Sequence, residues 1–88
     1  MFFCYIARCS DESLYVGSCA DLRLREVRHN AGAGALYTKY RRPVRIVYSE
    51  SFASRKDAVK REMQIKKWRR EKKENLIKFG HPNGEINF

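Results

Sequence analysis

The sequence lacks the features that mark several common classes of protein. No run of apolar residues approaches the roughly 20 that a membrane-spanning helix needs, so a membrane protein is not predicted. Residues 1–5 have no basic segment before their apolar stretch, so we expect no signal peptide. There is no internal repeat and no linker. Residues 1–88 therefore predict one small domain, because so short a chain cannot bury enough surface for two cores.

Cysteine is also scarce. The three cysteines, Cys4, Cys9 and Cys19, are an odd number without a Cys-x-x-Cys pair, so neither a disulfide framework nor a zinc site is indicated. Free cysteine usually behaves as a small hydrophobic residue, and Cys4 and Cys9 are therefore expected to be buried thiols. This usage favours a reducing, intracellular compartment, either cytoplasmic or nuclear.

Acidic residues are few beside the basic ones. Ten Asp and Glu stand against nineteen Lys and Arg, which gives a formal net charge of +9. Such a charge attracts polyanions, and nucleic acid is the polyanion that we expect. The alternative is a surface that only keeps the protein in solution, because charge by itself is a weak signal. The hydrophobic content of 43% is typical of a globular protein and predicts that the chain folds.

The first half of the chain has the pattern of a hairpin, a helix and a strand. Phe2 to Arg8 and Leu14 to Gly17 are rich in aromatic and β-branched residues and predict a β-hairpin. Asp21 can cap a helix that runs to about His29, and the glycine-rich segment 30–34 ends it. Alternating apolar residues predict a third strand from Val44 to Ser49.

The second half is helical. Ser54 followed by Asp57 is a helix-start signal, and apolar residues keep helical spacing through Trp68. Residues 71–79 either continue this helix or form a separate one, which Gly80 and Pro82 end before a loop. The order β-β-α-β-α-α predicts an α/β (α+β) domain with a three-stranded, mostly antiparallel sheet flanked by helices.

Two polar residues on the first predicted helix are candidates for a site. Arg25 and His29 lie four residues apart, which places them on one face. Leu24 and Val27 point elsewhere, so we expect these two to form the apolar face and leave Arg25 and His29 to line a groove. A solvated surface is the alternative for both polar residues.

Glu62 stands out because of the residues around it. Helical geometry places it between Ala58, Val59 and Ile65, near the middle of the stripe that should face the sheet. Burying an unpaired charge costs several kcal/mol, so Glu62 should meet a cation, a metal or a hydrogen-bonded network. The alternative to a metal is a salt bridge with Lys66 or Arg69.

These residues together resemble a known family. Phe3-Cys4-Tyr5, followed after nine residues by Tyr15-Val16-Gly17, resembles the two half-motifs of the GIY-YIG nuclease superfamily. Arg25 and His29 follow at matching distances, and the segment from Ala58 to Glu62 looks like the family helix that carries its metal-binding glutamate. Residues 34–38, 42–44 and 65–68 resemble the small single-domain branch, which is similar to the N-terminal catalytic domain of the excision-repair incision subunit.

The resemblance departs from the family pattern at two places. Phe3 and Cys4 stand where the name motif has Gly and Ile, at strand positions that should tolerate change. The family's late asparagine matches Asn75 or Asn83, or His81 stands in its place, and the sequence leaves this open.

The resemblance implies a metal-dependent endonuclease that hydrolyses DNA phosphodiester bonds, structure-directed or weakly specific, with DNA repair among its contexts. Glu62 would hold Mg²⁺ or Mn²⁺, and Arg25 would stabilise the phosphate. Tyr5 is the expected general base, with its proton loosened by Arg25 and with help from His29. Tyr15 would orient water or phosphate. The alternative function is a nucleic-acid-binding module on the same scaffold with little or no catalysis.

A basic run near the end of the chain is the candidate DNA-binding surface. A solvated helix face is the alternative reading of this run. No second domain is present to read bases, so we expect recognition of DNA shape or ends, or a protein partner that supplies specificity. The candidate nucleic-acid-binding residues are Lys66, Arg69, Arg70 and Lys72.

Overall fold

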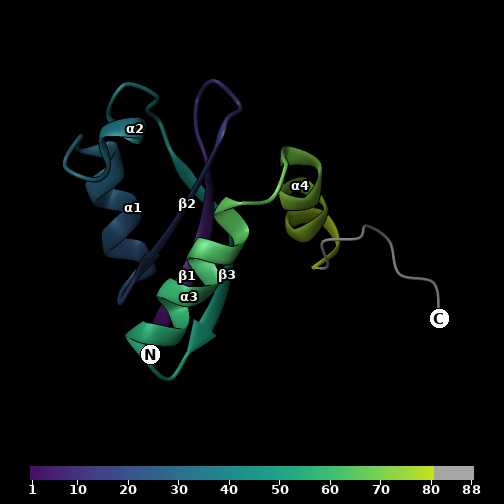
Figure 1. Ribbon diagram of the computed structural model, residues 1–88. Coiled ribbons are helices and arrows are strands. Elements are labelled where there is room, and N and C mark those ends of the chain that lie inside the picture. The colour runs from purple at the N-terminus through teal and green to yellow at the C-terminus, as the bar shows by residue number, and fades with distance from the viewer. Residues whose placement is uncertain (81–88) are drawn as a thin grey trace.

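A computed structural model describes residues 1–80, which form a three-stranded sheet with helices around it (Figure 1). The candidates His81 and Asn83, and the loop expected after Gly80, lie outside the described residues. In chain order the elements are β1 (Phe2–Arg8), β2 (Leu14–Cys19), α1 (Leu22–Asn30), α2 (Leu36–Lys39), β3 (Arg45–Phe52), α3 (Arg55–Lys66) and α4 (Arg70–Phe79).

The sheet has the order β2-β1-β3, and both pairings are antiparallel. In the central strand β1, four consecutive residues from Cys4 to Ala7 are buried, because both faces of the sheet are covered. On one face Cys4 and Ile6 pack with Ile65 of α3 and Leu76 of α4. On the other, Tyr5 and Ala7 pack in a cluster that includes Leu22 of α1. Figure 1 shows α1 and α3 on either side of the sheet.

The predicted fold class is confirmed, and so are the local signals at the helix starts. The side chain of Asp21 accepts the backbone N–H of Leu24, and that of Ser54 accepts the N–H of Asp57. Residues 70–79 form a separate helix, which ends at Gly80 in the left-handed conformation with φ of 72°. The short helix α2 was not predicted.

Helix α1 packs differently from the prediction. Leu24 and Val27, expected to be its apolar face, are 54% and 59% exposed, whereas His29 is fully buried. Polar side chains hold the helix to β3 instead. The amide of Asn30 donates to the Val44 carbonyl at 2.8 Å and accepts the Val44 N–H at 2.6 Å. The carboxylate of Glu26 accepts the Ile46 N–H at 2.8 Å. These bonds pair one backbone N–H of β3 and both backbone groups of Val44 just before it, and they turn the polar face of α1 inward.

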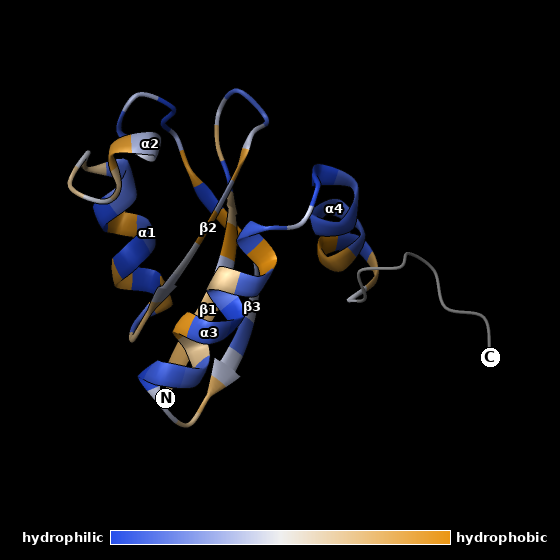
Figure 2. Ribbon diagram, in the orientation of Figure 1, coloured by the Kyte–Doolittle hydropathy of each residue, from blue (hydrophilic) through white to orange (hydrophobic). Residues whose placement is uncertain are grey.

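The distribution of hydropathy agrees with a core at the sheet. Apolar residues gather on β1, whereas the helices are hydrophilic with narrow apolar bands (Figure 2). The three cysteines are buried and free, as predicted for Cys4 and Cys9. Burial, followed by the nearby charges of Glu50 and Glu62, raises the pKa of Cys4 to about 12, so it stays a protonated thiol. Within residues 1–80, no helix is both long enough and apolar enough to cross a membrane.

Candidate active site

Tyr5 and His29 meet in the interior between β1 and α1. Tyr5 is 1% exposed, and its hydroxyl lies 2.7 Å from Nε2 of His29, twenty-four residues along the chain. The strand fixes the tyrosine and the helix fixes the histidine, because both side chains are fully enclosed by packing. The structure therefore brings together two of the residues that the sequence singled out.

The hydrogen-bond chain continues from His29 to a residue that the sequence did not single out. Nδ1 of His29 lies 2.8 Å from the hydroxyl oxygen of Thr38, which is itself fully buried. That hydroxyl donates to the carbonyl of Ala35 at 3.0 Å. A hydroxyl has one proton, so Thr38 must accept from Nδ1–H of His29. A neutral His29 then has its lone pair on Nε2, where it accepts the hydroxyl proton of Tyr5.

The burial of this pair changes both pKa values. Burial, with help from the charge of Arg25, lowers the pKa of His29 below its ordinary value of 6.5, so the imidazole is neutral at neutral pH. Burial also raises the pKa of Tyr5 well above its ordinary value, and Tyr15 adds to this increase while Arg25 opposes it. Arg25 thus loosens the Tyr5 proton, as expected, but desolvation of the phenolate outweighs the attraction of this one cation, and the net shift is upward.

The lowered pKa of His29 predicts how the free energy of unfolding depends on pH. The unfolded chain binds the histidine proton at a higher pH than the folded chain does. The contribution of His29 is therefore fully present above about pH 6.5 and is lost as the pH falls from 6.5 towards the lower pKa of the folded state. Urea unfolding of the wild-type protein and of His29→Gln, above and below this pH, measures the effect. Equal slopes with pH in both proteins would contradict it.

Tyr15 completes an aromatic cluster around this hydrogen-bond chain. Its ring centroid lies 5.3 Å from that of His29 and 6.3 Å from that of Tyr5. On its other side Tyr37 of α2 stacks on it, with a centroid distance of 6.1 Å and an interplanar angle of 26°. Tyr15 is half-buried, with rings packed against it from β1, α1 and α2. The two tyrosines of the half-motifs are thus neighbours at one site.

Two glycines allow the backbone to approach the buried pair closely. A Cβ atom at Gly17 would lie 2.6 Å from the hydroxyl oxygen of Tyr5, and a Cβ at Gly34 would overlap the ring of His29. Both positions therefore need glycine because of space, whatever their backbone angles. Gly17 is the glycine of the second half-motif, and Gly34 belongs to the segment that ends the first helix, so the sequence carried the signal for both.

Arg25 and Glu62 bring opposite charges to the surroundings of Tyr5. Both act on the pKa of the phenol, Arg25 lowering it and Glu62 raising it, which places them near the same side chain from different helices. Arg25 is half-buried on α1, one turn before His29. The groove expected to be lined by Arg25 and His29 thus receives only Arg25, because His29 points into the core.

Glu62 lies in the buried stripe of α3, as expected. Ala58 and Ile65 on either side of it are buried, whereas Val59, which was expected in the same stripe, is 36% exposed; the Glu62 side chain is 15% exposed. Its carboxylate forms an ion pair with Lys66 at 2.7 Å, which is one of the partners that the sequence left open. The Lys66 side chain is 49% exposed, so its ammonium lies at the surface beside the carboxylate.

The donor set around Glu62 fits a divalent ion that takes most of its ligands from elsewhere. Within residues 1–80, no group of three or more His, Cys, Asp or Glu side chains is placed to hold a metal ion. Mg²⁺ commonly binds through one or two carboxylates and completes its shell with water and substrate phosphates. The ammonium of Lys66 beside Glu62 shows that the local environment accommodates a cation at this carboxylate.

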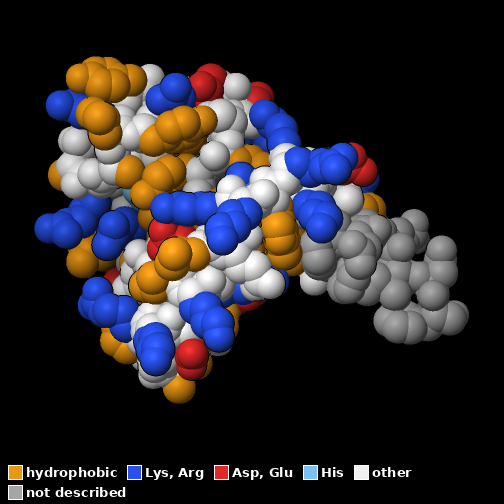
Figure 3. All heavy atoms as spheres, viewed as in Figure 1, with side chains coloured by type: hydrophobic (Ala, Val, Ile, Leu, Met, Phe, Trp, Pro, Cys, Tyr) orange, Lys and Arg blue, Asp and Glu red, His pale blue; other side chains and the backbone are white. Residues whose placement is uncertain are grey.

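The predicted DNA-binding residues differ in their surroundings. Arg70 contacts the carboxylate of Glu74 at 3.1 Å and donates to the carbonyl of Glu12 at 2.5 Å. Lys72 lies 5.8 Å from the ring centroid of Trp68, and Arg69 is exposed. Lys66 and Arg70 are thus engaged within the protein, while a role for any of the four in binding remains a prediction. Figure 3 shows basic side chains over α1, α3 and α4 on one face, with acidic ones interspersed.

The residue that takes the place of the family's late asparagine is not assigned. Asn75 is half-buried on α4. The other two candidates lie outside the described residues.

Solved structures support the fold of this chain. The solution NMR structure of a UPF0213 protein from Bacillus halodurans is 38% identical, with a TM-score of 0.55 over 88% of this chain and 83% of that one. The solution NMR structure of a protein from E. faecalis is 33% identical, with a TM-score of 0.58 over 98% of this chain and 92% of that one.

Sequence comparisons agree. A UPF0213 protein from Staphylococcus aureus is 51% identical over 76 residues, which cover 86% of this chain and 93% of that protein. Residues 1–75 match the family described as the GIY-YIG catalytic domain, a stretch that contains Tyr5, Tyr15, Arg25, His29 and Glu62. With the motif residues gathered around one buried tyrosine, the chain belongs to the GIY-YIG family of nuclease domains.

Proposed function

We propose that this chain is a metal-dependent endonuclease that hydrolyses DNA phosphodiester bonds. The observation that carries the proposal is the buried hydrogen-bond chain from Tyr5 through His29 to Thr38, with Arg25 and Glu62 both acting on the same tyrosine. Hydrolysis of a phosphodiester needs a base for water, a positive charge for the phosphate and a stabilised leaving oxygen. The site supplies a group for each need.

The Tyr5–His29 pair acts as one base. The attacking water gives a proton to the Tyr5 oxygen while the Tyr5 hydroxyl proton moves to Nε2 of His29. The raised pKa of Tyr5 is then no obstacle, because a free phenolate never has to form. The water oxygen bonds to phosphorus, the bond from phosphorus to the leaving oxygen breaks, and that oxygen takes a proton from solvent. After cleavage His29 returns its extra proton to the Tyr5 oxygen, which in turn gives up the proton it took from water.

Thr38 holds the histidine ready for this transfer. Its hydroxyl accepts Nδ1–H of His29, so the lone pair of the neutral ring faces Tyr5. When His29 becomes positively charged, the same bond becomes a charge-assisted one and stabilises the imidazolium. Thr38 is therefore a positioning residue, which acts on the reaction only through His29.

The charged residues serve the phosphate. The guanidinium of Arg25 presents a fork of N–H donors that suits phosphate oxygens, and its half-buried position strengthens the attraction. Glu62 would hold Mg²⁺ or Mn²⁺, which when bound neutralises phosphate charge and stabilises the leaving oxygen. Lys66, now paired with Glu62, would then be available as one more cation for the DNA backbone. Tyr15 orients water or phosphate through its hydroxyl.

The substrate follows from charge and size. A net charge of +9 supplies affinity for any DNA backbone without choosing a sequence. The proposed endonuclease therefore recognises DNA shape or ends, as in repair, or takes its specificity from a partner. Three buried free thiols support action inside the cell.

Incubation of the purified protein with supercoiled plasmid and with branched oligonucleotides tests this proposal. We expect cleavage in Mg²⁺ or Mn²⁺ and none in EDTA, because Glu62 needs the ion to act. A preparation of Tyr5→Phe made in parallel controls for contaminating nucleases. Tight binding to both substrates without cleavage in either metal would favour the nucleic-acid-binding module.

A further inference from the structure

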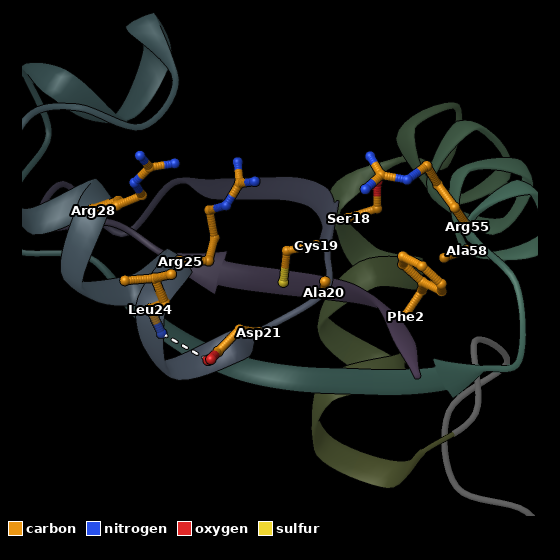
Figure 4. Close-up of a pocket in the computed structure, with 10 residues that line it drawn as sticks. All are labelled: Phe2, Ser18, Cys19, Ala20, Asp21, Leu24, Arg25, Arg28, Arg55 and Ala58. Atoms are coloured by element: carbon orange, nitrogen blue, oxygen red, sulfur yellow. Dashed lines mark hydrogen bonds between the residues drawn. The ribbon is translucent and has the colours of Figure 1, made fainter.

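A pocket beside Arg25 lies outside the hydrogen-bond chain that the proposed reaction uses. Its volume is about 190 Å³, and it opens between the end of β2, helix α1 and the start of α3. Figure 4 shows Arg25 in the middle of its rim, with Arg28 on one side and Arg55 on the other. The guanidinium groups of all three extend to the same side of the pocket in this view.

No carboxylate among residues 1–80 forms an ion pair with any of these three arginines, which stand around one pocket. Among residues 1–80, none of Arg25, Arg28 and Arg55 makes a hydrogen bond or an ion pair with another side chain. In contrast, Arg8 and Arg61 each contact a glutamate, at 2.7 Å and 2.9 Å. Three like charges around one hollow repel each other, and a bound anion removes that repulsion.

The rest of the pocket does not neutralise the arginines. Asp21 is the carboxylate among the lining residues, and its Oδ1 accepts the backbone N–H of Leu24 at the start of α1. Phe2 and Leu24 add apolar surface. The guanidinium carbon of Arg55 lies 5.3 Å from the ring centroid of Phe2, so the ring supports this arginine beside the pocket.

We infer that this pocket binds a phosphate group of the DNA strand, next to the phosphate that is cut. The inference rests on the proposed function for the position of the cut. Arginine forks match phosphate oxygens, and the pocket is smaller than the roughly 300–1,000 Å³ of sites for larger organic ligands. Arg25 both lines the pocket and acts on Tyr5, so a strand lying along the arginines passes from the pocket to the base.

The phosphate comes either from within the strand or from its end. An internal and a terminal phosphate both offer oxygens that the arginines can bind. In both cases Phe2 and Leu24 provide an apolar surface for the adjoining sugar. An internal phosphate would make the pocket part of a track along the backbone. If it binds a terminal phosphate, the pocket would fix the distance between a DNA end and the cleavage site.

Binding of short single-stranded oligonucleotides in EDTA tests the inference without any cleavage. We expect Arg28→Gln with Arg55→Gln to weaken binding on the order of tenfold at moderate salt, and to lower the slope of log Kd against log salt by about 0.7, the value for one lost phosphate contact on a single strand. The matched control is Arg23→Gln with Arg45→Gln, which removes the same charge from exposed residues outside the pocket. Equal losses in the two double variants, with equal slopes, would overturn the inference.

Modified oligonucleotides identify the phosphate. Oligonucleotides with one neutral methylphosphonate linkage, or with and without a terminal phosphate, are compared on the wild type and the pocket variant. An internal neutral linkage that weakens only the wild type assigns an internal phosphate, and the same behaviour for the end assigns a terminal one. If neither change distinguishes the two proteins, the pocket does not bind phosphate. Absence of cleavage by the wild type would refute the proposed function, but the binding results would still show whether the pocket binds phosphate.

Discussion

Replacing Glu62 with glutamine is expected to abolish metal-dependent cleavage while leaving the fold and DNA binding largely intact. Glutamine keeps the volume of the side chain in the buried stripe of α3 but carries no charge to hold a divalent ion. The measurement is the single-turnover rate of oligonucleotide cleavage across a range of Mg²⁺ concentrations. Because the carboxylate is missing, raising the Mg²⁺ concentration should not restore the rate.

The cost of this substitution to stability should be small. The variant loses the ion pair with Lys66, whose side chain is half exposed, and such pairs contribute about 0–1 kcal/mol. Glu12→Gln is a suitable control, because it removes a carboxylate that is 75% exposed and 3.9 Å from Arg8. Full cleavage by Glu62→Gln in Mg²⁺, with the same midpoint for the metal as the wild type, would remove Glu62 from the mechanism.

Arg25→Ala should reduce the cleavage rate by about 10²-fold or more with little effect on DNA affinity. One preorganised donor to the charge that develops in the transition state contributes roughly 2.7–4 kcal/mol. Ground-state binding is spread over the many other cations of a chain with net charge +9, so the loss of one changes affinity little. Rates measured at saturating protein separate the two effects, since saturation removes any difference in affinity.

The neighbouring Arg23→Ala provides the control for this prediction. Arg23 lies on the same helix and is exposed, so it carries the same charge outside the site. We expect the rate of Arg23→Ala at saturation to match the wild type. Equal rate losses in both variants would mean that Arg25 acts only through general charge, and a large loss of affinity with an unchanged rate would make it a binding residue.

Local signals explain why most of the fold could be predicted from the sequence. Asp21 and Ser54 each cap a helix through their own side chain, and the apolar residues of β1 and β3 mark the strands. These features depend on residues within a few positions of each other, so they are visible without tertiary structure. Ala58 and Ile65 placed Glu62 in the buried stripe for the same reason.

Long-range polar contacts explain what could not be predicted. Helix α1 is attached to β3 by the side chains of Asn30 and Glu26, and no periodicity of hydropathy encodes such bonds. The sequence analysis therefore assigned the wrong face of α1 to the core and placed His29 in a groove at the surface. Thr38 was missed because a single threonine in a one-turn helix carries no pattern, and only its bond to His29 shows its place.

The origin of the oxygen in the product tests the central claim most directly, that an activated water hydrolyses DNA at Tyr5 and His29. A single turnover in ¹⁸O-labelled water with Mg²⁺, followed by mass spectrometry of the DNA, reports this oxygen. Hydrolysis by water predicts that each new phosphate end carries one ¹⁸O atom and that no DNA remains attached to the protein. An unlabelled phosphate, a covalent link from DNA to Tyr5 or Tyr15, or no cleavage at all would contradict it.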